Sequence, residues 1–307
     1  MDGGWSTIES DEGVFTSLIE TLGVKDVQFE EIISLDADSI RSLSPYGVIF
    51  LFKWTNDRSS SPSHPPDGSY DTTAVDSGLF FAAQTIQNAC GTQAILSVIL
   101  NQESIDLGAE LSSFKDFTTG FPPSLRGDAL SNSEPIRVAH NAFARASPFA
   151  DETARPPRPD EESADVYHFI AYTPVNGTLY ELDGLQPHPI SHGECDLESF
   201  PDRVIEVLAR RIARYPEGEI RFNLMAVVRD LRIRAREFGD AELLQREERK
   251  RRGWAWENTL RRWNFVGFIG EMMRGVVALK EGEGPSAYAD WVEGAKSETL
   301  KRKGYSQ

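Results

Sequence analysis

The chain has 307 residues, 40% of them hydrophobic, and a formal net charge of −16. The acidic excess lies in residues 1–200, which carry 31 acidic and 10 basic side chains, whereas residues 201–307 carry 17 acidic and 22 basic ones. This distribution argues against nucleic acid as a ligand of the acidic part and is compatible with a basic protein substrate, although a surface selected for solubility explains it equally well.

The sequence shows no sign of membrane insertion or secretion. No apolar run approaches membrane-spanning length, and the acidic N-terminus around Trp5 does not resemble a signal peptide. Cys90 and Cys195 are the only cysteines; they could pair, but so few suit a reducing compartment better than a disulfide framework. We therefore expect a cytoplasmic or nuclear protein that binds neither membranes nor nucleic acid.

The first half of the chain predicts two helices, a strand and an irregular insertion. Residues 11–22 place apolar side chains on one helical face, with acidic residues in the first turn, and a second helical pattern lies near 135–146. Residues 47–52 form a continuous apolar run typical of a buried strand. Residues 55–78 are polar and rich in serine and proline, which indicates a surface loop or a disordered insertion.

Cys90 lies directly before the apolar pattern of another predicted helix, which continues through Ile99. On the first turn of that helix, unpaired backbone N–H groups would favour a thiolate. Gln84, six residues upstream, is a candidate side-chain donor to an oxyanion. The segment therefore predicts a cysteine nucleophile beside an oxyanion stabiliser.

Residues 145–165 combine four prolines with acidic residues, so they predict neither a helix nor a strand. Residues 145–165 would be a linker if they separated two domains. If Cys90 and His168 belong to one site, however, residues 145–165 form a flexible loop across that site, and such loops often gate substrate entry.

A predicted hairpin brings a histidine and an aspartate together. Residues 166–173 and 178–183 have the composition of strands, and Asn176-Gly177 between them is the strongest short hairpin signal. A two-residue turn there pairs Val175 with Thr178 and, further along the strands, Ile170 with Asp183. His168 and Asp183 then become diagonal neighbours on one face, roughly 7–8 Å apart at the backbone, so the carboxylate can orient the imidazole. A shift of one residue would place them on opposite faces.

These four side chains together predict nucleophilic catalysis. A Cys90 thiolate would attack a carbonyl, His168 would stabilise the thiolate and protonate the leaving amine, and Asp183 would orient the imidazole. Gln84 and the Cys90 backbone N–H would stabilise the oxyanion. A lone cysteine or histidine more often has a structural role, and it is the combination that indicates an enzyme.

A metal site near Cys195, His188 and His192 is a weaker interpretation. A fourth ligand is not evident, and the spacing is not that of a zinc motif. We expect neither a metal nor another cofactor.

The C-terminal third predicts a helix, a strand and a long helical extension. Ser199 is a candidate helix cap, with Arg211 in the last turn, and residues 220–224 alternate as a strand does. Residues 231–252 then predict a charged helix. Residues 256–280 carry a broad apolar face that would dock on the catalytic part or on a partner.

Several of these segments resemble the ubiquitin C-terminal hydrolases, the papain-like UCH family. The resemblance covers roughly residues 4–230, a catalytic domain, and leaves 231–307 as an extension. It implies an α/β (α+β) fold: a knotted papain-like domain with a central antiparallel sheet flanked by helices. The similar segments are Gln84–Asn101, His168–Ile170, Glu181–Leu185, Trp5–Asp11 and Gly218–Ala226.

The resemblance also implies roles for individual residues. Residues 145–165 match the crossover loop over the family's cleft, and Gly91 stands where family members commonly have alanine. The positions of the oxyanion donor, nucleophile, base and orienter are taken by Gln84, Cys90, His168 and Asp183. Positions that help to bind ubiquitin are taken by Leu185, Ile220 and Phe222.

The extension resembles that of the proteasome-associated family member, most clearly at Arg261–Ile269. There the extension binds the adaptor domain of the proteasomal ubiquitin receptor. The residues expected to bind that partner are Trp263, Phe265, Phe268, Ile269 and Met272. We predict a thiol hydrolase that cleaves peptide or isopeptide bonds after the C-terminal glycine of ubiquitin, at the proteasome. Two alternatives stay open: a chromatin-associated deubiquitinase with a different adaptor, and a ubiquitin-binding scaffold with vestigial catalysis.

Overall fold

The structure, a computed structural model, describes residues 4–53, 64–144, 167–216, 218–284 and 286–302. By contacts, the described chain divides into two compact units, the first ending at Arg262 and the second beginning at Trp263. The first unit therefore includes the predicted charged helix that follows residue 230. The predicted crossover loop at 145–165 lies outside the described residues, as does part of the predicted insertion.

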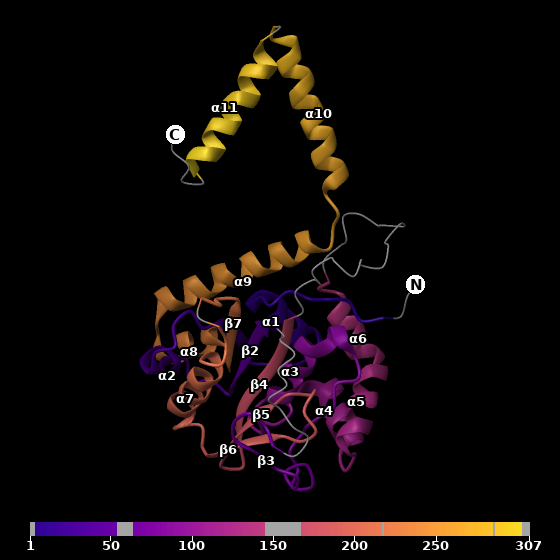
Figure 1. Cartoon of the computed structure of the whole chain (residues 1–307), viewed down its shortest axis with the longest axis vertical. Coiled ribbons are helices and arrows are strands. Elements are labelled where there is room, and N and C mark those ends of the chain that lie inside the picture. Colours follow the sequence, from indigo (N-terminus) through magenta and orange to yellow (C-terminus); the bar gives the residue numbers. More distant parts are fainter. Residues whose placement is uncertain (1–3, 54–63, 145–166, 217, 285, 303–307) are drawn as a thin grey trace. The chain divides into compact units, whose positions relative to one another are not determined.

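A seven-stranded sheet forms the centre of the first unit (Figure 1). Every pair of neighbouring strands is antiparallel, which confirms the predicted antiparallel sheet. The strand order is β1-β7-β2-β4-β5-β6-β3. The strands are β1 (Val27–Glu31), β2 (Gly47–Lys53), β3 (Ser69–Tyr70), β4 (Tyr167–Val175), β5 (Thr178–Leu182), β6 (Ile190–Glu194) and β7 (Phe222–Arg229).

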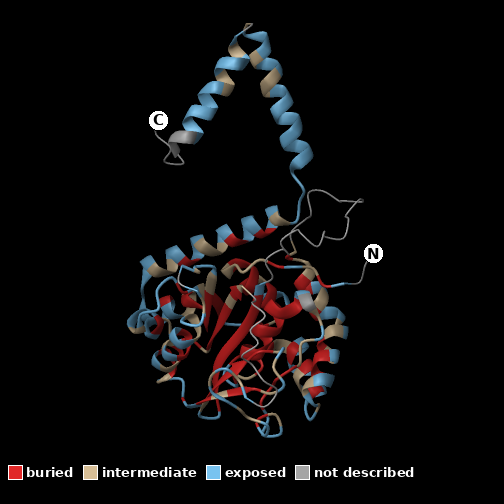
Figure 2. Cartoon of the chain, in the orientation of Figure 1, coloured by how far each residue is buried: buried red, intermediate tan, exposed pale blue. Residues whose placement is uncertain are grey.

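Helices cover both faces of this sheet and bury a core on each (Figure 2). Along β2 the side chains alternate between the cores: Ile49 belongs to one, and Val48 and Phe50 belong to the other. The first core contains apolar residues of α1 and α3, and the second those of α2 and α7. The helices are α1 (Glu12–Thr21), α2 (Ala37–Leu43), the 3₁₀ turn η1 (Gln87–Ala89), α3 (Cys90–Ile99), α4 (Gly108–Thr118), α5 (Pro123–Asn132), α6 (Glu134–Asn141), α7 (Phe200–Ile212), α8 (Leu231–Phe238) and α9 (Ala241–Arg261).

Local capping decides where these helices begin and end. The α1 helix is confirmed, and the Asp11 carboxylate caps it by accepting a hydrogen bond from the Val14 N–H at 2.9 Å. The prediction of one helix over 231–252 is wrong. Gly239 adopts a left-handed conformation, with φ of 67°, and ends α8; Asp240 then caps α9.

Three other local predictions need correction. Ser199 does not cap α7 with its side chain, because its hydroxyl oxygen accepts a hydrogen bond from the Asp196 N–H instead, at 3.1 Å. Ile220 lies before β7 rather than in it, because a tight turn joins the Phe222 N–H to the Ile220 carbonyl at 2.9 Å. The region predicted as an irregular insertion contains the short strand β3 at Ser69–Tyr70.

The described residues of the second unit form the helices α10 (Val266–Gly282) and α11 (Ala287–Arg302). The predicted continuous apolar face over 256–280 is wrong as a single surface, because α9 ends at Arg261 and α10 begins at Val266. No residue of α10 is buried (Figure 2). Among the described residues, no helix has the length and apolar character needed to cross a membrane.

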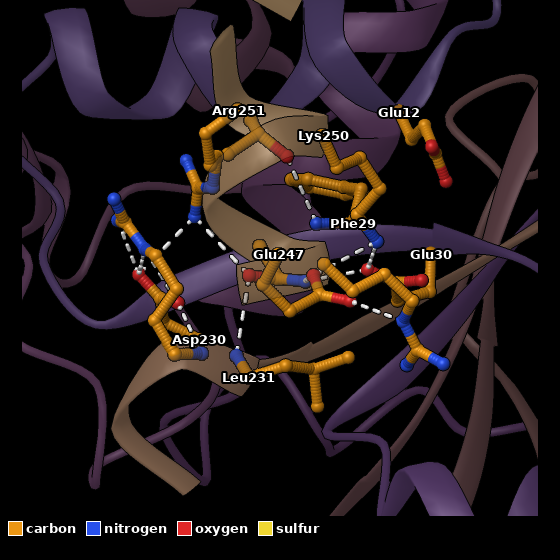
Figure 3. Close-up of polar contacts among 12 residues, drawn as sticks. Glu12, Phe29, Glu30, Asp230, Leu231, Glu247, Lys250 and Arg251 are labelled. Carbon is orange, nitrogen blue, oxygen red and sulfur yellow. Dashed lines mark hydrogen bonds and ion pairs between the residues drawn. The ribbon is translucent and has the colours of Figure 1, made fainter. Parts of the chain in front are cut away.

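Buried charged side chains fix α9 to β1 and to the start of α8 (Figure 3). Glu247 of α9 is 1% exposed. Its carboxylate accepts a hydrogen bond from Gln28 at 3.2 Å and pairs with Lys250 at 3.0 Å. Arg251 donates to Gln28 and to the Asp230 carboxylate, each at 3.2 Å. Because a buried charge is costly without its partner, these contacts hold α9 in one position along the sheet edge.

The α9 helix also packs so closely on α1 that only glycine fits at the contact. A Cβ atom added to Gly13 would lie 2.5 Å from Cγ of Trp254, a buried side chain of α9. The Asn258 side chain donates to the Gly13 carbonyl at 3.1 Å. Gly253 lies on α9 next to Trp254 but faces open space. In the described part of the chain, a Cβ added there meets no atom of another element within 4 Å.

Alanine at these two helical glycines should have opposite effects. Gly13→Ala forces Trp254 to move and should lower the free energy of unfolding by about 1–3 kcal/mol. Gly253→Ala meets open space and should raise it by about 0.5–1 kcal/mol, because alanine is the better helix former. Chemical denaturation of the parent and both variants measures the effects. An equal gain at both positions would contradict the packing of α9 on α1.

Candidate active site

The α3 helix begins at Cys90, as predicted, directly after the 3₁₀ turn η1. The side chain of Cys90 is buried, and its thiol is free, like that of Cys195. His140 of α6 holds the helix start through a 2.7 Å hydrogen bond with the Thr92 hydroxyl. In the preceding 3₁₀ turn, the Asn88 amide donates to the Trp5 carbonyl at 3.0 Å. The N-terminal segment and α6 together fix the position of the thiol.

The β4–β5 hairpin has the predicted register. Val175 pairs with Thr178 across Asn176-Gly177, both of which have positive φ. His168 Nε2 lies 2.7 Å from Asp183 Oδ1, and both side chains are buried. The sequence-based expectation that the turn aligns this imidazole with this carboxylate is therefore confirmed.

Asp183 is held in place by the turn that follows β5. Its Oδ1 also accepts a hydrogen bond from the Leu185 N–H at 3.0 Å. The Gln186 N–H donates to the Asp183 backbone carbonyl at 2.9 Å. With its backbone and its side chain both bonded, the carboxylate can orient the His168 ring without moving itself.

The electrostatics of His168 favour the imidazolium. Burial alone lowers the pKa of His168, but hydrogen bonds and charge interactions with Asp183 and Cys90 outweigh it and raise the pKa to about 9. Because Nε2 faces Asp183, Nδ1 is the nitrogen that faces the Cys90 thiol. The ring is thus protonated at neutral pH and positioned to stabilise a thiolate.

Gln84 lies on a segment fixed by backbone contacts from both sides. The Gln84 N–H donates to the Gly184 carbonyl at 2.8 Å, directly after Asp183. The preceding Ala83 N–H donates to the Pro123 carbonyl at 2.9 Å. Gln93 of α3 donates its side-chain amide to the Ala82 carbonyl at 2.6 Å. The segment is therefore joined both to the nucleophile helix and to the aspartate turn.

The three predicted ubiquitin-binding residues lie in different surroundings. Leu185 is 46% exposed and follows Asp183 directly in the chain, whereas Ile220 is 85% exposed before β7. Phe222 is partly buried, and its ring packs against Phe50 and Tyr215 at centroid distances of 5.5 and 5.0 Å. Leu185 and Ile220 are accessible for binding, while much of Phe222 supports the core.

The residues of the weaker metal interpretation do not meet. The His188 ring packs on Tyr70, His192 bonds to Glu181 at 3.2 Å, and Cys195 lies near Asp196. In the described ranges no group of three or more His, Cys, Asp or Glu side chains could hold a metal ion.

Sequence reasoning missed a buried charged pair behind the hairpin. Glu181 of β5 and Arg211 of α7 are joined at 2.5 Å. The sequence pattern places Arg211 only in the last turn of a helix. The available signal was the strand period of two, which places Glu181 on the same face as Asp183 and predicts a partner for its charge.

Comparison with known proteins identifies the family. Residues 5–213 match the profile of ubiquitin carboxyl-terminal hydrolase, family 1. The chain belongs to this family. It is a cysteine-type ubiquitin hydrolase, and residues 240–280 match a second profile of ubiquitin carboxyl-terminal hydrolases.

Relatives of this ubiquitin hydrolase match it over most of its length. Ubiquitin carboxyl-terminal hydrolase 2 of Schizosaccharomyces pombe is 47% identical over 97% of this chain and 99% of its own. Ubiquitin carboxyl-terminal hydrolase isozyme L5 of Dictyostelium discoideum is 45% identical over 74% of this chain and 62% of its own. The crystal structure of the Trichinella spiralis UCH37 catalytic domain bound to ubiquitin vinyl methyl ester is similar, with a TM-score of 0.63 and 38% identity over 75% of this chain and 97% of that one.

Two glycines at the site of the ubiquitin hydrolase should respond differently to alanine. A Cβ on Gly184 would lie 2.1 Å from Nε2 of Gln93 and 3.0 Å from Gln84, so Gly184→Ala should displace the Gln84 segment. A Cβ on Gly91 meets only the Phe169 ring, at an ordinary 3.5 Å. We expect kcat to fall by about tenfold or more in Gly184→Ala, because small misplacements of reacting groups are costly.

Gly91→Ala is the matched control and should keep the parent kcat with slightly higher thermal stability. Steady-state turnover of a ubiquitin C-terminal amide measures both variants. Equal kcat values in the two variants would contradict the tight packing at Gly184.

Proposed function

We propose that this ubiquitin hydrolase cleaves the bond after the C-terminal glycine of ubiquitin with Cys90 as its nucleophile, His168 as its acid and base, and Asp183 as the group that orients His168. The observation that carries this assignment is the 2.7 Å His168–Asp183 contact on a hairpin whose imidazole also faces the thiol. The paired imidazole and carboxylate favour an active enzyme over a ubiquitin-binding scaffold with vestigial catalysis.

The reaction follows from these positions. The Cys90 thiolate attacks the carbonyl carbon of the terminal glycine, and the carbonyl electron pair moves to oxygen. Collapse of the tetrahedral species breaks the C–N bond, His168 gives its proton to the leaving amine, and a thioester remains on Cys90. His168 then removes a proton from water, whose oxygen attacks the thioester and releases the thiolate.

The oxyanion requires donors on the side opposite the imidazole. Cys90 contributes its backbone N–H at the start of α3, and Gln84 contributes its side-chain amide from the fixed segment. Preorganised donors of this kind need no rearrangement when charge develops on the oxygen. The contacts of Ala82, Ala83 and Gln84 support this role because they hold the donor segment to the nucleophile helix.

Removal of the nucleophile and removal of the oxyanion donor should have separable effects. Cys90→Ala should abolish turnover of a ubiquitin C-terminal amide. Gln84→Ala should lower kcat by about 10²–10³ and still allow a ubiquitin electrophile to label Cys90. Cys195→Ala, which removes the other buried thiol, should leave kcat unchanged. Full turnover by Cys90→Ala would refute the assignment.

The same proposal includes a protein partner for the second unit. Five large apolar side chains at the start of this unit are exposed to between 40% and 66%. Exposed apolar clusters of this kind are typical of protein interaction sites. They are Trp263, Phe265, Phe268, Ile269 and Met272. We propose that they bind the adaptor domain of a proteasomal ubiquitin receptor and thereby bring the enzyme to ubiquitin conjugates at the proteasome, in the cytoplasm and the nucleus.

A charge placed in this apolar cluster should break the partner contact without changing the chemistry. Phe268→Asp in the full chain should weaken binding to the purified adaptor domain at least about tenfold, as expected at an interface centre. Arg274→Gln, at an exposed position of the same helix, makes the same change in net charge and should bind normally. Isothermal titration calorimetry measures both variants. Equal affinities for parent and Phe268→Asp would contradict the proposal, and so would co-purification with a chromatin adaptor instead.

A further inference from the structure

A buried network formed by Tyr172, Glu181 and Arg211 lies on the same face of the sheet as His168 and Asp183. The face is set by strand periodicity: His168 shares it with Tyr172 of β4, and Asp183 shares it with Glu181 of β5. Tyr172 pairs with Glu181 across the hairpin, and its hydroxyl donates to that carboxylate at 3.0 Å. The hairpin register that aligns the catalytic pair therefore also aligns this second pair.

Arg211 of α7 links the network to the support of His168. Its Nη1 donates to Glu181 at 2.5 Å, and its guanidinium carbon lies 4.6 Å from the centre of the Phe52 ring. Phe52 is the cross-strand partner of His168, and the two rings meet edge to face at 5.7 Å. Arg211 thus contacts the side chain against which the imidazole packs and holds the glutamate two residues before Asp183.

The charges of this network alternate along its length. The order of charges begins with the Cys90 thiolate, which is negative, and the His168 imidazolium, which is positive. It continues with negative Asp183, positive Arg211 and negative Glu181. The positive charge of Arg211 interacts with Asp183 as well as with Glu181. Glu181 remains ionised, because Arg211 and His192 outweigh its burial and lower its pKa to about 2. The guanidinium is therefore paired with Glu181, and its charge also acts on Asp183, the carboxylate that orients the imidazole.

We propose that Arg211 is a positioning residue for the His168–Asp183 pair, and that its ion pair with Glu181 sets the charge balance behind the imidazole. This inference rests on the proposed roles of Cys90, His168 and Asp183. The Arg211 guanidinium is held by Glu181 through Nη1 and lies over the Phe52 ring. In the described part of the chain its Nε is buried without a hydrogen-bond partner.

Other titratable groups also face this network. Tyr172, Asp183 and His192 face Arg211 or Glu181 from β4, from the end of β5 and from β6. Tyr215 faces Arg211 from the segment after α7. Asp67 lies 4.0 Å from His192 and pairs with Arg210 and Arg214 nearer the surface.

Loss of the Arg211 guanidinium should slow the chemistry more than it weakens substrate binding. In Arg211→Met we expect kcat for a ubiquitin C-terminal amide to fall by about tenfold or more, because His168 loses its support, and KM to change less than about twofold. Arg211→Lys keeps the charge without the planar guanidinium and should recover part of the kcat. Arg210→Met is the matched control: it removes a half-exposed arginine on the same helix and should keep the parent kcat.

The charge balance is tested separately by Glu181→Gln, which keeps the shape of the side chain but removes its charge and one of its two acceptor oxygens. Arg211 then loses its ion-pair partner on the far side of the Phe52 ring from His168, so the pKa of His168 should fall and the alkaline limb of the kcat/KM profile should move to lower pH, by about one unit. The double variant with Arg211→Met and Glu181→Gln has lost both charges. Its alkaline limb of kcat/KM should therefore lie close to the pH of the parent enzyme, while its kcat stays low. The pH dependence of Cys90 alkylation, followed by mass spectrometry, should show the same shifts without ubiquitin.

A purely structural role for Arg211 gives a different result. The inference is overturned if Arg211→Met lowers the thermal midpoint but keeps the kcat of the folded enzyme, or if Glu181→Gln leaves the alkaline limb in place. The failure of the underlying function is distinguishable, because Cys90→Ala would then retain turnover. An inactive Cys90→Ala beside a fully active Arg211→Met contradicts only the role of Arg211.

Discussion

The register of the β4–β5 hairpin is the constraint on which the site depends. Asn176 and Gly177 both adopt positive φ, of 49° and 77°, as a type I′ hairpin turn requires. Because side chains alternate across a sheet, a slip of one residue would carry His168 and Asp183 to opposite faces. The same slip would separate Tyr172 from Glu181. One short turn therefore fixes both the acid–base pair and the charged network behind it.

Burial gives these contacts their effect. In the dry interior an ionised group is costly unless an opposite charge or a hydrogen bond compensates it, and each interaction is stronger than it would be in water. His168 and Asp183 are almost fully enclosed, so the carboxylate and the thiol together outweigh the desolvation of the imidazolium. Arg211 and Glu181 satisfy the same requirement as a second charged pair behind the hairpin. From Cys90 inwards, each charged group lies next to one of opposite sign. This order allows several ionised side chains to be buried close together.

The sequence contains enough information to predict the catalytic residues but not the tertiary contacts that hold them in place. A period of two, an Asn-Gly turn and a thiol before an apolar helical pattern are local signals, and they led to Cys90, His168 and Asp183. The contact between Gly13 and Trp254 joins residues 241 positions apart, so no local pattern reveals it. Composition suggested one charged helix after residue 230, but Gly239 divides it into two. Arg211 looked like an ordinary basic residue at a helix end, because only the tertiary fold brings it to Glu181 and Phe52.

The titration of the His168 imidazole, followed by NMR in the full chain, tests the central claim most directly. Asp183 and Cys90 stabilise the charged ring, so His168 should stay protonated through neutral pH and lose its proton with a pKa of about 9. In Asp183→Asn the main compensating charge is gone while burial remains, so the pKa should fall by more than one unit, as neighbouring charges typically shift such groups by about 1–3 units. A parent His168 that titrates near 6.5, with no change in Asp183→Asn, would contradict the account.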